Sequence, residues 1–195
     1  MRVCLLSSNT GKFMDIDSPR LRYQPLIEDD WPFFLSLHQD REVMRFVSDT
    51  HDAGTLRRHA FDVRLPRWQP GSTHWLCLVM REKRSGEPVG LTGFIDRGQG
   101  IAEVGFLLAT AFQGQGYGTE SLRAVCQTAF ALGFRKLTAS VTVGNHASKA
   151  VLEKAGFRLE GVLRENYHLH GRWQDDWVFG LLPPVAESDQ AATRL

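Results

Sequence analysis

Hydrophobic and polar residues alternate along the chain in blocks that predict a series of strands and helices. The segment RLRYQPL at 20–26 alternates as a half-buried strand does. Acidic residues at 28–30 favour the start of a helix over 30–39, and apolar residues at helical spacing predict a second helix over 55–65. Pro66, Pro70 and Gly71 are expected to end that second helix.

The middle of the chain has the pattern of a strand meander followed by alternating helices and strands. Strands are expected at 74–82, 88–96 and 102–109, with a hairpin-length turn between the first two. This order predicts an α/β or α+β fold, a sheet with helices on both faces. The remaining expected elements are a helix over 119–132, a strand at 136–143, a short helix that Asn145 caps and Gly156 ends, and closing strands at 156–164 and 175–182.

The two ends of the chain lack this patterning. Residues 1–18 are small and polar with little periodicity, so we expect a flexible leader, in which Met14 is an alternative start. We expect residues 19–183 to form a single domain and residues 184–195 to fray.

Composition narrows the class of protein. A chain of 195 residues can bury a real core, and its net charge of +1 gives no support to a nucleic-acid partner. The three cysteines are far apart and lack CxxC spacing, which argues against a disulfide framework or a zinc site and favours a reducing compartment. Because no window has the apolar length of a membrane span, we expect a cytoplasmic protein with no membrane partner.

A glycine-rich run, FQGQGYGTESL at 112–122, stands immediately before the helix expected over 119–132. A helix N-terminus presents unpaired N–H groups, and glycine lets a ligand approach the backbone closely. A strand, a glycine loop and a helix in this order therefore predict a phosphate site, with a merely tight turn as the alternative. The spacing matches neither the G-x-G-x-x-G of dinucleotide sites nor a P-loop.

Two motifs resemble those of the GNAT acyltransferase superfamily. Gln113, Gly116 and Gly118 are similar to the Q/R-x-x-G-x-G/A pattern that binds the pyrophosphate of acetyl-CoA. VTVGNHASKAVLEKAGFRLEG at 141–161 resembles the second signature, most closely that of the ribosomal-protein N-terminal (alanine/serine) acetyltransferases. The resemblance covers about residues 20–183 and implies a GNAT-like fold, a twisted and mostly antiparallel sheet with helices on both faces.

The resemblance also implies where acetyl-CoA, the co-substrate, binds. Main-chain groups of Phe106, Leu107 and Leu108 would pair with the pantetheine arm as an added strand does. Asn145 and Ser148 would lie near the pantetheine and the thioester. The pyrophosphate would be held by backbone amides of Gln113, Gly114, Gln115, Gly116, Tyr117, Gly118 and Thr119.

Acetyl transfer requires a neutral amine, a polarised thioester carbonyl and a proton for the departing thiolate. The N–H of Leu108 is a candidate for stabilising the oxyanion, and Ser148 matches a serine that the N-terminal branch uses near the thiolate. Glu103, at the reactive end of the central strand, is the first candidate base. A water chain is the alternative, because an α-amine with a pKa of about 7.7–8.0 is already partly neutral at physiological pH.

Two positions depart from the family pattern. Leu152 stands where many members have a tyrosine that acts as general acid, and Tyr167 stands where the ribosomal branch has a candidate glutamate base. Tyr167 is therefore a second candidate for acid work or acceptor binding. His168 and His170 lie beside it, but no third ligand is spaced to complete a metal site.

The predicted function is transfer of an acetyl group from acetyl-CoA to a primary amine by direct attack in a ternary complex. The resemblance favours a protein N-terminal α-amine as acceptor. A small amine (an amino acid, polyamine or drug) and a non-catalytic acyl-CoA-binding module are the alternatives, because one fold serves many functions. A monomer or a homodimer is expected.

Overall fold

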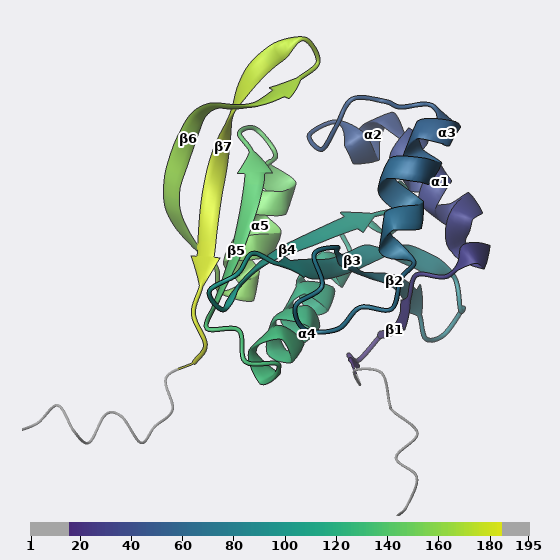
Figure 1. Ribbon diagram of the computed structural model, residues 1–195, viewed down its shortest axis with the longest axis horizontal. Helices are drawn as coiled ribbons and strands as arrows, with labels where there is room; N and C mark the ends of the chain where they lie inside the picture. Colours follow the sequence, from purple (N-terminus) through teal and green to yellow (C-terminus); the bar gives the residue numbers. More distant parts are fainter. Residues whose placement is uncertain (1–15, 185–195) are drawn as a thin grey trace, which may run out of the picture.

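Seven strands form one mixed sheet in the order β1-β2-β3-β4-β5-β7-β6. The computed structural model describes residues 16–184 (Figure 1). The predictions for residues 1–15, including Met14, and for the tail from 185 lie outside the described residues. The strands are β1 (Leu21–Pro25), β2 (Leu76–Glu82), β3 (Pro88–Asp96), β4 (Ile101–Leu108), β5 (Lys136–Thr142), β6 (Arg158–Leu169) and β7 (Arg172–Leu181).

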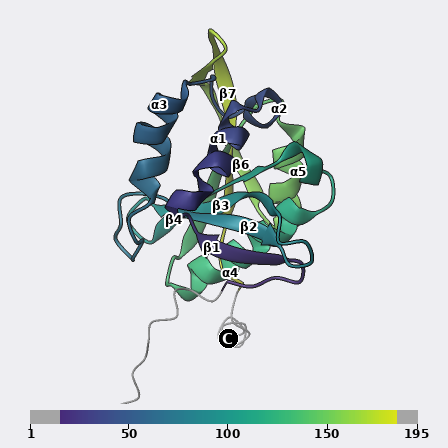
Figure 2. The same ribbon diagram turned by 90° about the vertical axis from the view of Figure 1, so that its right-hand side faces the viewer.

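Helices cover both faces of this sheet, as predicted (Figures 1 and 2). The face of the sheet that carries the side chains of Val79 and Leu91 packs against Phe34 and Phe61 from the first helical segments. The other face packs against the two later helices, and their shared core includes Leu122 and other fully buried side chains. The helices are α1 (Trp31–Gln39), α2 (Arg41–Met44), α3 (Ala53–Leu56), α4 (Tyr117–Ala131) and α5 (His146–Ala155).

Most predicted elements lie within two residues of their observed bounds, and three findings differ. α2 and a 3₁₀ turn, Thr110–Phe112, were not predicted, because elements of three or four residues leave no periodic pattern. β6 extends beyond its predicted end. The prediction was too short because almost all residues of this strand are exposed, so they leave no alternating pattern in the sequence. Residues 16–18 are not part of a leader: Ile16 is 8% exposed in the main core, and the Ser18 hydroxyl donates to Glu120.

The predicted helix over 55–65 is a continuous but irregular run. It starts as α3, passes through a π-helical turn at Arg57–Phe61 and ends in a 3₁₀ turn at Asp62–Arg64. Phe61 from this run is completely buried against α1. The run therefore lies over the same sheet face as α1 and brings Arg64 to that face.

The central feature of the sheet is the separation of β4 from β5. These strands pair in parallel only from Ile101 to Glu103, opposite Lys136 to Thr138. Beyond this point β4 stays paired with β3 as far as Leu108, and β5 stays paired with β7. The edge of β4 over residues 104–108 that faces β5 is consequently without a strand partner, and the sheet opens there.

Gly93 allows β2 and β3 to approach closely beside this opening. Its φ is +155°, and a Cβ at this position would lie 1.7 Å from the carbonyl oxygen of Leu76. No side chain fits without moving the backbone of β2. Glycine is thus required at this position for β2 and β3 to pair at their observed distance.

Replacing Gly93 with alanine should therefore destabilise the protein by about 3 kcal/mol, since overpacking and backbone strain add. The matched control is Gly161→Ala in β6, where a Cβ would meet nothing within 4 Å. Urea unfolding followed by circular dichroism measures both variants. Equal midpoints for the two would contradict the close approach of β2 and β3.

Candidate active site

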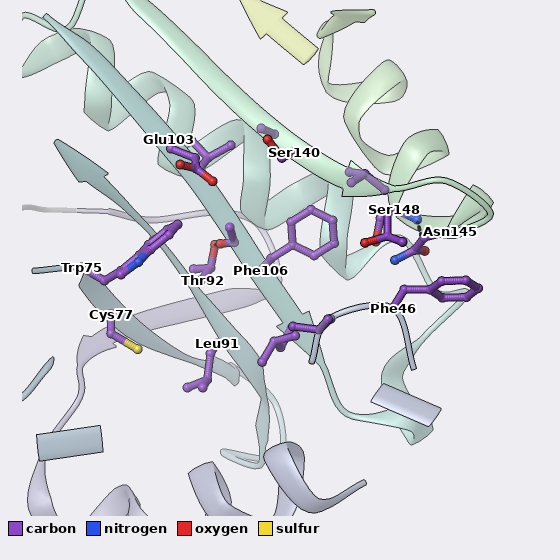
Figure 3. Close-up of a pocket in the computed structure, with 18 of the residues that line it drawn as sticks. Phe46, Trp75, Cys77, Leu91, Thr92, Glu103, Phe106, Ser140, Asn145 and Ser148 are labelled. Carbon is purple, nitrogen blue, oxygen red and sulfur yellow. Dashed lines mark hydrogen bonds between the residues drawn. The ribbon is translucent and has the colours of Figure 1, made fainter. Parts of the chain in front are cut away.

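A cavity of about 430 Å³ lies where β4 and β5 separate. Its floor is formed by β2, β3 and β4, and one wall by α1 and the Arg57–Arg64 run. Residues from β5, β6, β7 and the start of α5 form the opposite wall. Phe46 and Val47, from the turn after α2, complete the lining. Figure 3 shows Glu103 and Trp75 at one end of this pocket, Ser148 and Asn145 at the other, and Phe106 between them.

Asn145 and Ser148 are brought together by the first turn of α5. The Asn145 side chain caps this helix by accepting a hydrogen bond from the backbone N–H of Ser148 at 3.1 Å. Both residues line the pocket, while the hydroxyl of Ser148 has no hydrogen-bond partner among the described residues. The serine hydroxyl is therefore available to a ligand.

Glu103 also lines the pocket, but it is not next to Ser148 (Figure 3). Its Oε2 accepts hydrogen bonds from Arg97 Nε at 2.8 Å and from a terminal guanidinium nitrogen at 2.7 Å. This ion pair leaves only Oε1 to accept a proton. The predicted base role of Glu103 stays a prediction, with one oxygen available for it.

Tyr167 reaches the pocket from β6 and joins two distant parts of the chain. Its hydroxyl donates to the carbonyl of Val47 at 2.9 Å, and near the same hairpin tip Nδ1 of His170 lies 2.9 Å from Oδ1 of Asp49. Burial, together with the carboxylates of Asp49 and Asp176, raises the pKa of Tyr167. The phenol is consequently protonated at neutral pH, which suits an acid or a hydrogen-bond donor and not a base.

Asp176 is a pocket residue that the sequence reasoning missed. It is 6% exposed, lines the pocket from β7 and stands opposite Thr142 of β5. Its single side-chain donor is Asn166 Nδ2 at 2.8 Å, and no basic group pairs with it within residues 16–184. A buried carboxylate without a cation is costly, so a ligand ammonium at this wall would be favoured.

Cys77 lies on the pocket floor, near the wall that α1 and the Arg57–Arg64 run form. Burial raises the pKa of its thiol to about 12. Because the thiolate and not the thiol is the nucleophile, Cys77 is not a candidate for carrying the acetyl group.

The glycine loop before α4 has the form of an anion cradle. Gly116 is the N-cap residue, with φ of +85°, and no side chain caps the helix. Within the part of the chain that the structure describes, none of the backbone N–H groups from Gly114 to Thr119 donates a hydrogen bond. Six amides without acceptors at a helix N-terminus fit the pyrophosphate of acetyl-CoA.

Side chains hold this loop from outside and leave its amides free. Gln113 Nε2 donates to the carbonyl of Leu108 at 3.1 Å, which ties the loop to the end of β4. Arg20 donates to the carbonyl of Gln115 at 3.0 Å and lies 4.2 Å from the ring centre of Tyr117. The loop thus keeps its shape without using the groups that would contact phosphate.

The other cofactor-binding predictions are placed consistently with this loop. Phe106 and Leu107 line the pocket on the part of β4 that β5 leaves, and Leu108 closes that strand. A Cβ on Gly118 would meet Leu108 and Val151 at 3.2–3.5 Å, so Gly118 serves the close packing of α4. The role of each of these residues toward acetyl-CoA stays a prediction.

Replacing Gly116 with valine should weaken acetyl-CoA binding at least tenfold, because the side chain disfavours the left-handed backbone that presents the amides. Gly86→Val is the matched control: Gly86 also has a positive φ, +76°, but lies in the turn between β2 and β3. Calorimetric titration with acetyl-CoA compares the two. Equal affinities in folded variants would refute the cradle.

No group of three or more metal-ligating side chains occurs among residues 16–184. In the same range, no helix has the length and apolarity needed to cross a bilayer.

Comparisons with known proteins agree with this geometry. Residues 20–158 match the family model described as the acetyltransferase (GNAT) domain. The probable N-acetyltransferase YjcK of Bacillus subtilis is 40% identical over 87 residues, which are 44% of this chain and 48% of that protein. The putative ribosomal N-acetyltransferase YdaF of the same species is 33% identical over 90 residues, 46% of this chain and 49% of that protein. The matched segment thus spans about half the length of each of these relatives.

Solved structures show the same fold. The ribosomal L7/L12 α-N-protein acetyltransferase RimL, in complex with coenzyme A, has a TM-score of 0.74 at 23% identity and covers 86% of this chain and 97% of that one. Spermidine N-acetyltransferase of Vibrio cholerae, with coenzyme A and spermine, has a TM-score of 0.69 at 22% identity and covers 84% and 95%. These structures confirm the predicted fold. The family model confirms the predicted enzyme class at the level of the family, for which acetyl-CoA is the co-substrate. The chain belongs to the GNAT acetyltransferase family.

Proposed function

We propose that the protein transfers the acetyl group of acetyl-CoA to the α-amine of a protein N-terminus. The observation that carries the proposal is the combination of six amides without acceptors among the described residues, in the glycine loop and the first turn of α4, with the open edge of β4. The amides take the pyrophosphate, and the strand edge takes the pantetheine amides. The thioester then reaches the pocket that Ser148, Tyr167 and Asp176 line. The compartment proposed with this function is the cytoplasm.

A protein N-terminus is favoured over other amines by three points. One relative is named a putative ribosomal N-acetyltransferase, and the RimL structure, which shares the fold, is named an α-N-protein acetyltransferase. The pocket is also lined by two apolar residues from the turn after α2, Phe46 and Val47, against which a peptide chain can lie. An α-amine asks less of a base than a lysine or a polyamine, because its pKa is about 7.7–8.0.

In the proposed mechanism Asp176 takes a proton from the acceptor ammonium. It is the pocket carboxylate without a cationic partner, whereas Glu103 is already paired with Arg97. The neutral amine attacks the thioester carbonyl carbon, and the carbon–sulfur bond breaks as the tetrahedral intermediate collapses. Ser148 or the protonated Tyr167 gives a proton to the departing thiolate and recovers one from the nitrogen, which loses its second proton as it becomes an amide. Transfer is direct, since the Cys77 thiol is not ionised near neutral pH.

Turnover tests the proposal as a whole. N-terminal peptides, polyamines, amino acids and aminoglycosides are each incubated with acetyl-CoA, and thiol release is followed together with the intact mass of the acceptor. We expect the highest kcat/KM with a peptide and a single acetyl group on its α-amine. Faster turnover of a polyamine would contradict the acceptor assignment. No thiol release above background with any amine would identify a non-catalytic acyl-CoA-binding module.

Substituting the two pocket carboxylates tests which one is the base. Asp176→Asn should lower kcat by about 100-fold or more below the acceptor's own pKa, and raising the pH should partly restore it. Glu103→Gln should change kcat only a few-fold. Asp175→Asn is the matched control, because this neighbouring carboxylate accepts from the backbone N–H of Glu165 instead of lining the pocket. A large loss in Glu103→Gln with little effect at Asp176 would assign the base to Glu103.

A further inference from the structure

One wall of the pocket carries a positive charge that nothing in the described chain neutralises. Arg64 lines the pocket from the end of the Arg57–Arg64 run. Its guanidinium donates to the carbonyl of Ala60, and no carboxylate lies within ion-pair distance of it among residues 16–184. Burial lowers the pKa of Arg64, but arginine stays charged at neutral pH.

The groups around Arg64 do not supply the missing negative charge. His38 is neutral, because burial and the nearby Arg64 lower its pKa. The hydrogen bond that its Nδ1 donates to the carbonyl of Phe34 at 2.8 Å opposes this shift only in part. The Cys77 thiol is neutral as well. Asp30 is occupied by Arg81 at 2.6 Å. A partly buried cation without a counter-ion is unfavourable, so the wall is suited to an anionic group of a ligand.

The phosphates of acetyl-CoA are not that group. The cradle at Gly116 packs with Tyr117 on the sheet face that α4 covers. Arg64 lies over the opposite face, beside Cys77 and the α1 side chains. The pocket at Arg64 is therefore on the acceptor's side of the sheet. A single guanidinium fork also matches the two oxygens of one carboxylate.

The distance along the sheet indicates how far this carboxylate is from the reacting amine. Arg64 neighbours Cys77 on β2, and the sheet opens beside β4, two strands away. Two strand spacings place the edge of β4, where the amine would attack the thioester, about 10 Å from Cys77. An extended peptide spans that distance within three residues, since each residue advances by about 3.3 Å. The amine and carboxylate of a free α-amino acid are too close together to reach both places.

We propose that Arg64 binds an acceptor carboxylate about 10 Å from the amine that is acetylated, so that the preferred acceptor is a peptide N-terminus with an acidic side chain at its second or third residue. Asp176 on the opposite wall receives the ammonium. The pocket thus selects an acceptor whose ammonium and carboxylate groups are separated by this distance. This inference rests on the proposed function and adds a substrate class to it.

The experiment compares matched acceptors that differ only in charge. One pair is an N-terminal peptide with glutamate or glutamine at the second residue, and a second pair has the exchange at the third residue. A small-molecule pair is an ω-amino acid whose amine and carboxylate are about 10 Å apart, and its amide. We expect kcat/KM to be about 10- to 100-fold higher for the acidic member of a peptide pair, as one charge-assisted contact allows.

Arg64→Gln should abolish this discrimination while acetyl-CoA affinity, measured by calorimetry, stays unchanged. Arg64→Lys should keep part of it. Arg58→Gln is the matched control, because Arg58 is an exposed arginine of the same run that does not line the pocket. Thermal unfolding checks that each variant is folded, and the wild-type comparison stands even if a variant is not.

The outcomes separate this inference from the proposed function. Equal kcat/KM within every peptide pair would overturn the role of Arg64 and leave N-terminal acetylation intact. Acetylation of the ω-amino acid in preference to its amide, with no peptide acetylated, would support Arg64 and overturn the N-terminal acceptor. Preference for the acidic peptide that persists in Arg64→Gln would overturn the assignment to this residue.

Discussion

The site depends on the parallel pairing of β4 with β5 and on the point at which this pairing ends. β4 and β5 share three residue pairs and then separate, although each continues as a strand with its other neighbour. An unpaired strand edge inside a sheet is ordinarily unfavourable, because backbone groups lose their partners. Here the separation creates both the pocket and the free edge that pantetheine can occupy. Close packing on either side, such as the contact of Gly93 with β2, keeps the rest of the sheet closed around the opening.

The charges of the pocket are arranged across this opening. Within residues 16–184, Asp176 on β7 has no cationic partner and Arg64 on the helical wall has no anionic partner. Both cost free energy in the free protein and become favourable contacts when a ligand with the opposite charges is bound. Glu103, in contrast, is neutralised internally by Arg97. The proposed substrate class follows from which charges the chain leaves unpaired, and not from its net charge.

The fold was predictable where strong local signals bound an element. β3 matches the expected 88–96 at both ends because turns flank it, and α5 ends at Gly156 as expected. The unpaired amides at the N-terminus of α4 were predicted from the glycine spacing and the expected start of a helix. Asp176 was not, since only the register with Thr142 tells which of two adjacent aspartates lines the pocket. Arg64 was missed for a similar reason: the π-helical turn before it breaks the regular helical period, so helical spacing could not tell which arginine faces inward.

Amide hydrogen exchange with and without acetyl-CoA tests the central claim most directly. In the described part of the chain, the amides from Gly114 to Thr119 have no acceptors, and the edge of β4 after Glu103 has no partner strand toward β5. The account predicts that acetyl-CoA slows exchange in both segments together, while exchange in the exposed strand β6 stays the same. Binding of acetyl-CoA with unchanged exchange in these two segments would contradict it.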